Sequence, residues 1–239
     1  MARRRFFVLE VRRGKAELTG EDAEHLVRVL RAEVGQVYEL SDNHDVYLAR
    51  VTVARKSVVE FEVIEELPSE AELVKVSLVA ALFKFDRFEV MVEKATELGV
   101  CEVVPVEAVR TERGLAHAAV KRRARWQRIA VEASQQSRRV TLPEIQPVRR
   151  FADGLLSAAE LKLLLDEDRQ AAPILNVLPK VVVGSVALLV GPEGGWTDDE
   201  RSQALVSGWL GCSLGKTVLR AETAALAGLA VIRAWASVG

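Results

Sequence analysis

The feature that most restricts how this chain can fold is a pair of almost uninterrupted apolar runs, at residues 74–83 and 185–190. A strand with one face in water alternates apolar and polar residues, whereas a strand covered on both faces is apolar almost throughout. The two runs therefore predict strands in a sheet that helices cover on both sides. Between them, residues 85–98 carry apolar side chains at helical spacing, and Gly99 follows as a typical residue after a helix C-terminus.

The rest of this region continues the alternation of strand and helix patterns. Alternating strands and helices are typical of an α/β domain with a mostly parallel sheet, which is the fold class predicted here. The further strands are expected at residues 100–106, 161–165 and 211–214, and the further helices at residues 118–138, 198–206 and 222–238.

The first 70 residues have a different pattern, with short β-branched segments separated by turn residues. One helix is expected after Thr19, because an acidic first turn and apolar residues at helical spacing follow it as far as Leu30. The sequence Leu-Pro-Ser-Glu at residues 67–70 reads as a linker, so we expect a small β-barrel domain at residues 1–69 and the α/β domain at residues 70–239. The strands of the barrel are expected at residues 6–9, 37–40, 46–53 and 58–64.

The charge of the chain is unevenly distributed, although the net charge is only −1. Residues 1–31 carry eight Lys/Arg against five Asp/Glu, and residues 110–150 carry eleven against three, so the remainder is strongly acidic. Such a distribution allows a basic face that binds phosphates. The basic segment that begins at Lys121 fits phosphate contacts, but by itself it also fits an ordinary solvated helix face.

Metal sites, export and membrane insertion are not indicated. Cys101 and Cys212 are far apart and fit no metal-ligand spacing, and His25, His44 and His117 belong to no metal or triad pattern. The longest apolar stretch, residues 224–232, is far shorter than the roughly 20 residues that span a bilayer. We therefore expect a cytoplasmic protein with reduced thiols, no metal and no membrane partner.

The strongest local motif is the sequence Gly-Pro-Glu-Gly-Gly at residues 191–195, directly after the apolar run. Ligands of open α/β sheets bind beyond the carboxyl ends of the strands, where glycines let backbone groups approach them closely. Residues 197–200, Thr-Asp-Asp-Glu, then read as a helix start. The motif predicts a small-molecule site held by main chain, and the alternative is a tight connection without a ligand.

A second motif lies at residues 214–224, Leu-Gly-Lys-Thr-Val-Leu-Arg-Ala-Glu-Thr-Ala. Its Gly-Lys-Thr resembles a phosphate-binding loop, but that loop needs a glycine five residues before Gly215, where this chain has Leu210. A dinucleotide-binding glycine pattern is also missing. The segment is therefore interpreted as a loop that enters a helix, with Arg220 and Glu222 at the helix start.

Together these segments resemble the SPOUT-class methyltransferases, and within that class the ribosomal RNA small subunit methyltransferase E family, which methylates N3 of a uridine. The resemblance extends over nearly the whole chain, in the same order. It rests on residues 28–31 (Arg-Val-Leu-Arg), residues 93–100 with Pro105, residues 126–145 with their Trp-Gln-Arg-Ile-Ala start, and the two motifs at 191–195 and 219–224.

The resemblance implies a PUA-like N-terminal domain and a C-terminal SPOUT domain with a deep trefoil knot, a rare exception to the rule against threaded chains. It also implies bound S-adenosylmethionine, a homodimer whose active site uses both subunits, and 16S ribosomal RNA or the assembled small subunit as substrate. The acidic stretch Asp166-Glu167-Asp168 departs from the family pattern, where a less acidic sequence is common.

Carried over by position, the resemblance implies three groups of site residues. The cofactor-binding residues would be Leu165, Val190, Gly191, Pro192, Gly194, Gly195, Leu214, Gly215, Val218, Leu219 and Thr223. The catalytic candidates would be Arg220, Glu222 and Glu193. The RNA-binding residues would be Arg5, Arg28, Arg31, Lys121, Arg122, Arg125, Arg138 and Arg139.

Two other functions fit parts of the sequence. One is a ribosome-assembly protein that binds RNA without catalysis. The other is a methyltransferase of the same fold that acts on transfer RNA or on a ribose 2′-oxygen. For the base-methylating function, we expect the arginines to hold phosphates and to favour the deprotonated uridine, and Glu193 is a further candidate to accept its proton.

Overall fold

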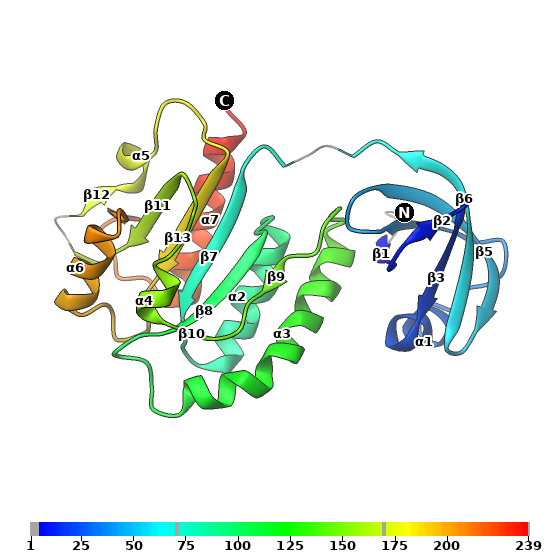
Figure 1. Cartoon of the computed structure of the whole chain (residues 1–239), viewed down its shortest axis with the longest axis horizontal. Helices are drawn as coiled ribbons and strands as arrows, with labels where there is room; N and C mark the ends of the chain where they lie inside the picture. The colour runs from blue at the N-terminus through cyan, green and yellow to red at the C-terminus, as the bar shows by residue number, and fades with distance from the viewer. Residues whose placement is uncertain (1–4, 70–71, 169–170, 239) are drawn as a thin grey trace. The chain divides into compact units, whose positions relative to one another are not determined.

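The computed structural model describes residues 5–69, 72–168 and 171–238, and the chain forms two compact units (Figure 1). The first unit consists of the described residues up to 69 together with residues 131–142, and the second consists of residues 72–130 and those from 143 onward. Helix α3 (Leu115–Gln136) therefore begins in the second unit and contributes its end to the first. Each unit has its own hydrophobic core.

The first unit is built on a six-stranded sheet. Its strand order is β1-β4-β5-β6-β3-β2; β1 and β4 are parallel, and the other neighbours are antiparallel. Alternate residues of β3 are buried, and Ala23 and Leu26 of helix α1 (Gly20–Arg28) complete the core. The strands are β1 (Arg5–Phe7), β2 (Val11–Arg12), β3 (Lys15–Thr19), β4 (Val37–Ser41), β5 (Val46–Arg55) and β6 (Val58–Leu67).

The four strands predicted for this unit are confirmed, but the sequence patterns missed the β2–β3 hairpin. Its strands are short and its turn is Arg13-Gly14 rather than a common hairpin pair, so no pattern marked it. The predicted helix is also shorter than expected. It ends at Arg28, and Leu30 is partly exposed beyond it.

The second unit contains an eight-stranded parallel sheet, as the apolar runs predicted. The order is β10-β8-β7-β13-β11-β14-β12, and β9 pairs with β8 beside this path. The strands are β7 (Lys75–Ala81), β8 (Glu102–Glu107), β9 (Glu144–Ile145), β10 (Arg149–Arg150), β11 (Leu161–Leu165), β12 (Ala172–Pro173), β13 (Ser185–Val190) and β14 (Leu210–Ser213).

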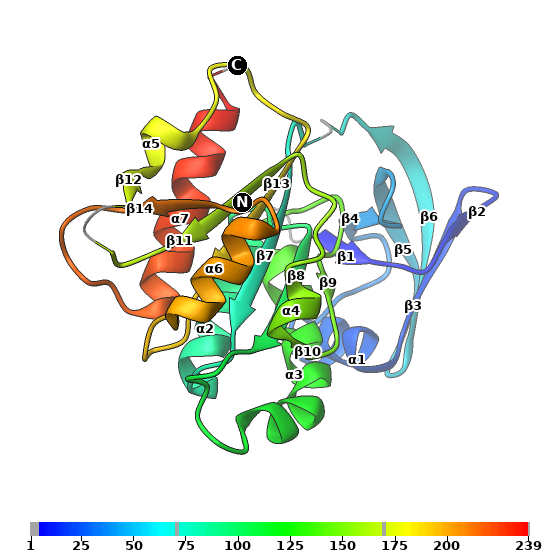
Figure 2. The ribbon, with the colours of Figure 1, turned by 60° about the vertical axis from the view of Figure 1, so that its left-hand side comes forward.

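Helices cover both faces of this sheet, which explains why its central strands are apolar throughout. Alternate residues of β7 enter two separate cores, with Leu78 on the side of α2 (Phe85–Glu97), α3 and α7 (Ala221–Ala236). Val79 faces the other core, with α4 (Phe151–Gly154) and α6 (Asp198–Val206), as Figure 2 shows for α6. Burying an aromatic side chain in such a core stabilises the fold by roughly 1.5–3 kcal/mol.

The predicted long helices and central strands of this unit are confirmed, with shifted ends. Helix α3 begins at Leu115 and stops at Gln136, before Arg138, which has a positive φ of 57°. The patterns missed β9, β10, β12, α4 and α5 (Ile174–Val177), because elements of two to four residues have no measurable periodicity. None of the helices in the described part is long and apolar enough to cross a membrane.

Candidate functional site

A cavity of the second unit lies at the carboxyl ends of β11, β13 and β14. Its volume is about 980 Å³, which is ample for a nucleoside-sized ligand. The register brings these strand ends together, since Leu164 pairs with Leu189 and Leu165 pairs with Cys212. The segments that line it are residues 165–168, 190–193, 195–196 and 213–221, with Arg87, Ala171, Pro173 and Ala224.

The turn after β13 brings main chain to the edge of this cavity. The N–H of Gly195 donates to the carbonyl of Pro192 at 2.9 Å, and Gly195 has a φ of 69°, which side chains rarely allow. A side chain on Gly191 would begin 3.1 Å from the ring of Trp196. Helix α6 then starts with a capping box between Thr197 and Glu200, as the sequence predicted.

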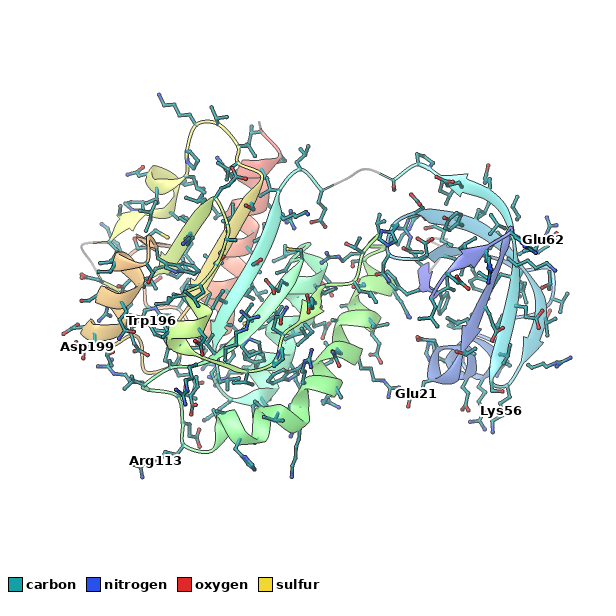
Figure 3. All side chains as sticks on the ribbon, in the orientation of Figure 1. Glu21, Lys56, Glu62, Arg113, Trp196 and Asp199 are labelled. Carbon is teal, nitrogen blue, oxygen red and sulfur yellow. The ribbon has the colours of Figure 1, made fainter. Side chains whose placement is uncertain are left out.

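Trp196 connects this turn to the neighbouring strand. Its indole N–H donates to the backbone carbonyl of Leu165 at 3.0 Å, and the side chain is buried against Phe151. In Figure 3 the labelled Trp196 lies beside α6, to its right in this view. This hydrogen bond satisfies a carbonyl at the very end of β11 and fixes one wall of the cavity.

The acidic residues after β11 have two different environments. Asp166 is paired with Arg201, whose Nε and Nη2 lie 2.8 and 3.2 Å from its carboxylate oxygens. Glu167 is exposed, and its carboxylate lies where a Cβ on Gly195 would stand. The cavity is therefore acidic on the side of residues 166–168.

Arg87, in the first turn of α2, links the glycine turn to helix α7. Its Nη1 lies 2.5 Å from Oε1 of Glu193, and its Nε lies 3.8 Å from Oε1 of Glu222. The other oxygen of Glu222, Oε2, is buried and has no hydrogen-bond partner among the described residues. Glu193 is thus engaged in a short ion pair, whereas Glu222 carries one buried oxygen without a hydrogen-bond partner among the described residues.

The segment from Leu214 to Arg220 forms the opposite wall. Gly215 has a φ of 133°, and the loop is largely exposed. Arg220 is the N-cap residue of α7, and its exposed guanidinium forms no ion pair with any other residue that the structure describes. A free cation thus lines the cavity near the carboxylates of Glu193 and Glu222.

The structure brings together most of the residues that were expected to bind the cofactor or to take part in catalysis. Gly194 and Thr223 do not line the cavity; a Cβ on Gly194 would instead meet the side chain of Arg110 at 3.3 Å. Glu222 reaches the site only through Arg87. The expected residues that line the cavity are Leu165, Val190, Gly191, Pro192, Glu193, Gly195, Leu214, Gly215, Val218, Leu219 and Arg220.

Sequence reasoning missed several lining residues, above all Arg87, Glu167 and Trp196. Arg87 had no signal, because its partner Glu193 is 106 positions away. Trp196 directly follows the glycine motif, and a large aromatic residue at that point could have been recognised as part of the turn.

Two of the expected RNA-binding arginines are buried, so a direct phosphate contact does not fit them. Arg5 is only 8% exposed; it donates to Glu39 at 3.0 Å and to the backbone carbonyl of Arg138 at 2.5 Å. Arg139 is 7% exposed. Glu39 also pairs with the side chain of Arg138, so these residues hold the first unit together.

The other expected RNA-binding residues are exposed, but several are already paired. Arg122 and Arg125 share Glu89, at 3.3 and 2.8 Å, on one face of α3. Arg28 lies 3.5 Å from Glu24. Arg31 and Lys121 are exposed, and neither forms an ion pair with the part of the chain that the structure describes.

Cys212 is buried in β14, whereas Cys101 is half-buried and lies just before β8. Burial raises the pKa of Cys212 to about 12 and also raises the pKa of the Cys101 thiol. Within the described residues, no group of three His, Cys, Asp or Glu side chains is arranged to hold a metal.

Comparisons with known proteins agree with this architecture. A family model described as an RNA methyltransferase domain matches residues 69–233, and an RNA methyltransferase PUA domain matches residues 18–64. The ribosomal RNA small subunit methyltransferase E of Synechocystis is 34% identical over 91% of this chain and 72% of its own length. That of Bacillus subtilis is 34% identical over 90% of this chain and 88% of its own.

Solved structures are similar over almost the whole chain. A ribosomal RNA small subunit methyltransferase E from Neisseria gonorrhoeae, bound to S-adenosylmethionine, is 31% identical with a TM-score of 0.88, and 98% of each chain is covered. A putative methyltransferase from Legionella pneumophila in complex with the same cofactor is 28% identical with a TM-score of 0.89 and the same coverage. With its parallel sheet, its cavity at the strand ends and its N-terminal PUA domain, this chain belongs to the ribosomal RNA small subunit methyltransferase E family.

Proposed function

We propose that this chain transfers a methyl group from S-adenosylmethionine to N3 of a uridine in 16S ribosomal RNA. The observation that supports this most directly is the cavity at the carboxyl ends of β11, β13 and β14. Open parallel sheets bind their ligands at this place. Two similar structures of the same fold are bound to this cofactor.

The cavity fits such a cofactor in size and in chemistry. The glycine turn offers backbone groups without side chains, since a Cβ on Gly191 or Gly195 would meet Trp196 or Glu167. The main chain at residues 190–195 and 214–219, with the end of β11 at Leu165, would hold the ligand. When bound, S-adenosylmethionine supplies an electrophilic methyl group.

The residues of this chain would then align the base and manage its proton. Methyl transfer needs the attacking nitrogen in line with the methyl carbon, so a rigid cavity wall is a large part of catalysis. The free guanidinium of Arg220 would stabilise the negative charge on a deprotonated uridine. Both nearby carboxylates contact Arg87, Glu193 at 2.5 Å and Glu222 at 3.8 Å. Glu222 would be the proton acceptor once the base displaces Arg87, because its buried Oε2 has no hydrogen-bond partner among the described residues.

The RNA would be held by basic residues that remain exposed. Arg28, Arg31, Lys121 and Arg138 meet this condition, and their charges would contact phosphates without reading sequence. Arg28 and Arg138 are already paired with Glu24 and Glu39, and Arg122 and Arg125 share Glu89. These four would contribute only where a phosphate competes with the acid. We further propose a homodimer, a knotted SPOUT domain and a cytoplasmic location, with either 16S RNA or the assembled small subunit as substrate.

Calorimetric titration with S-adenosylmethionine tests the cofactor site. Ala224 lines the cavity from helix α7, whereas Ala230 is exposed on the same helix. We expect wild-type protein and Ala230→Trp to bind the cofactor and Ala224→Trp to lose binding, with all three folded by circular dichroism. A wild-type protein that does not bind S-adenosylmethionine would favour the non-catalytic RNA-binding function.

The target is tested by methylating 16S RNA, digesting it and identifying the modified nucleoside by mass spectrometry. 3-Methyluridine is the expected product. A methyl group on another base or on a ribose 2′-oxygen would refute the N3 target and keep the methyltransferase activity. Parallel assays with transfer RNA and with assembled small subunits separate the remaining substrates.

A further inference from the structure

The β2–β3 hairpin gathers three basic side chains, Arg12, Arg13 and Lys15, within four residues. All three are exposed, and of the residues that the structure describes these three line a hollow of about 440 Å³. The hairpin extends beyond the rest of its sheet (Figure 2). Its turn precedes residues 18–64, the segment that the PUA family model matches.

The basic residues of the hairpin occupy positions where the local backbone structure favours other residue types. The turn Arg13-Gly14 has φ values of 51° and 72°, and the first position of such a turn is commonly Asn, Asp or Gly. Arg12 and Lys15 are direct partners across the two strands. Like charges in that position repel each other and destabilise the hairpin.

The three cations lack close acidic partners among the described residues. None of them forms an ion pair within 4.0 Å of a residue that the structure describes, although Glu62 is the register partner of Lys15 on β6 and Glu10 lies just before β2. Several other arginines of the described residues do form close pairs with acids, whereas Arg31 and Arg220 do not. Such pairs join Arg5 and Arg138 to Glu39, Arg122 and Arg125 to Glu89, Arg87 to Glu193, Arg201 to Asp166 and Arg233 to Glu72.

We propose that this hairpin binds the phosphate backbone of the RNA substrate. A phosphate held between Arg12 and Lys15 would remove their repulsion, and guanidinium groups bind phosphate oxygens with two parallel hydrogen bonds. A polyanion of regular spacing suits three cations fixed on a tight turn better than an acidic protein segment does. Such a contact contributes affinity and orientation but does not read the base sequence. The proposal rests on the proposed function only because it takes RNA as the ligand.

Equilibrium binding of 16S RNA transcript without cofactor, measured between about 50 and 300 mM KCl, tests this proposal. The variant Arg12→Ala/Lys15→Ala is compared with Arg55→Ala/Lys56→Ala, which removes the same charge from the β5–β6 turn of the same sheet. Figure 3 shows Lys56 at that turn, away from Glu62. Each lost phosphate contact lowers the steepness of log affinity against log salt concentration by about 0.7–0.9. For Arg12→Ala/Lys15→Ala we therefore expect this slope to be shallower by about 1.5 and RNA binding to be roughly five- to tenfold weaker.

A second variant separates binding from folding. Arg13→Asn places a favoured residue in the turn and removes one charge, so we expect a higher Tm together with weaker RNA binding. Equal affinity and slope for the Arg12/Lys15 variant and its control would overturn the proposal. The proposal would also be overturned if polyglutamate bound the wild-type protein more tightly than the Arg12→Ala/Lys15→Ala variant while both bound RNA equally. That result would indicate an acidic protein partner for the hairpin. The experiment measures RNA binding alone, and neither cofactor binding nor methyl transfer. Its result can therefore be interpreted even if the proposed methyltransferase function is wrong.

Discussion

The indole N–H of Trp196 donates to the backbone carbonyl of Leu165 at 3.0 Å, which ties the glycine turn after β13 to the end of β11. Trp209 makes a similar buried bond to the carbonyl of Leu155, at 3.2 Å, but it does not line the cavity. The two tryptophans therefore form a natural pair for separating stability from ligand binding.

We expect Trp196→Phe and Trp209→Phe each to lower the free energy of unfolding by about 0.5–1.5 kcal/mol, because each loses a buried hydrogen bond from the indole to a backbone carbonyl. Only Trp196→Phe should also weaken S-adenosylmethionine binding, since only Trp196 forms a cavity wall. Denaturation and calorimetry measure the two effects. Equal cofactor affinity in both variants would contradict the role given to Trp196.

Gly195 and Glu167 should be energetically coupled. Gly195→Ala introduces a Cβ at the Glu167 carboxylate, in addition to the cost of a side chain at a φ of 69°, about 1 kcal/mol. In the Glu167→Ala background only the backbone cost should remain. A double-mutant cycle on unfolding free energies measures this difference, and additive effects would show that Glu167 simply moves away.

Arg220→Ala should reduce the turnover of methyl transfer by about 10²–10³-fold, if the guanidinium stabilises charge that develops during the reaction. Cofactor affinity should change little. Lys216→Ala is the matched control, because Lys216 is an exposed cation that also lines the cavity. A parallel loss of turnover and cofactor affinity in Arg220→Ala would rule out the electrostatic role.

Glu222→Gln should slow methyl transfer more than Glu193→Gln does, because Oε2 of Glu222 is the carboxylate oxygen without a partner. If Glu222 takes the N3 proton, the rate of the Gln variant should recover as pH rises and the uridine ionises by itself. Profiles of turnover against pH for both variants provide the measurement. A larger, pH-dependent defect in Glu193→Gln would assign the proton to Glu193 instead.

Cys212 should stay protonated far into the alkaline range, because burial raises its pKa to about 12 from an ordinary value of 9.0. The folded protein then holds this proton while the unfolded chain releases it, so stability should fall as pH rises from 9.0 toward 12. The Cys101→Ser variant leaves Cys212 as the only thiol, and its thiolate absorbance can be titrated. A thiolate that forms near pH 9 in folded protein would contradict this placement.

The sequence by itself determined the features that depend on near neighbours in the chain. The apolar runs at 74–83 and 185–190 predicted a parallel sheet with two covered faces, because a strand buried on both sides cannot alternate. The glycine motif at 191–195 marked the edge of the cavity for a similar reason: a turn that needs a positive φ and close backbone approach restricts residue type locally.

The tertiary structure decided which side chains meet across long distances in sequence. Arg87 contacts Glu193 across 106 positions, and Arg5 contacts the Arg138 carbonyl across 133. A charge in a sequence looks the same whether it is free or paired, so Arg5 resembled a phosphate ligand although it is buried on Glu39. The sequence carries the pattern of each element, but only packing determines which charges are neutralised and which remain free to bind.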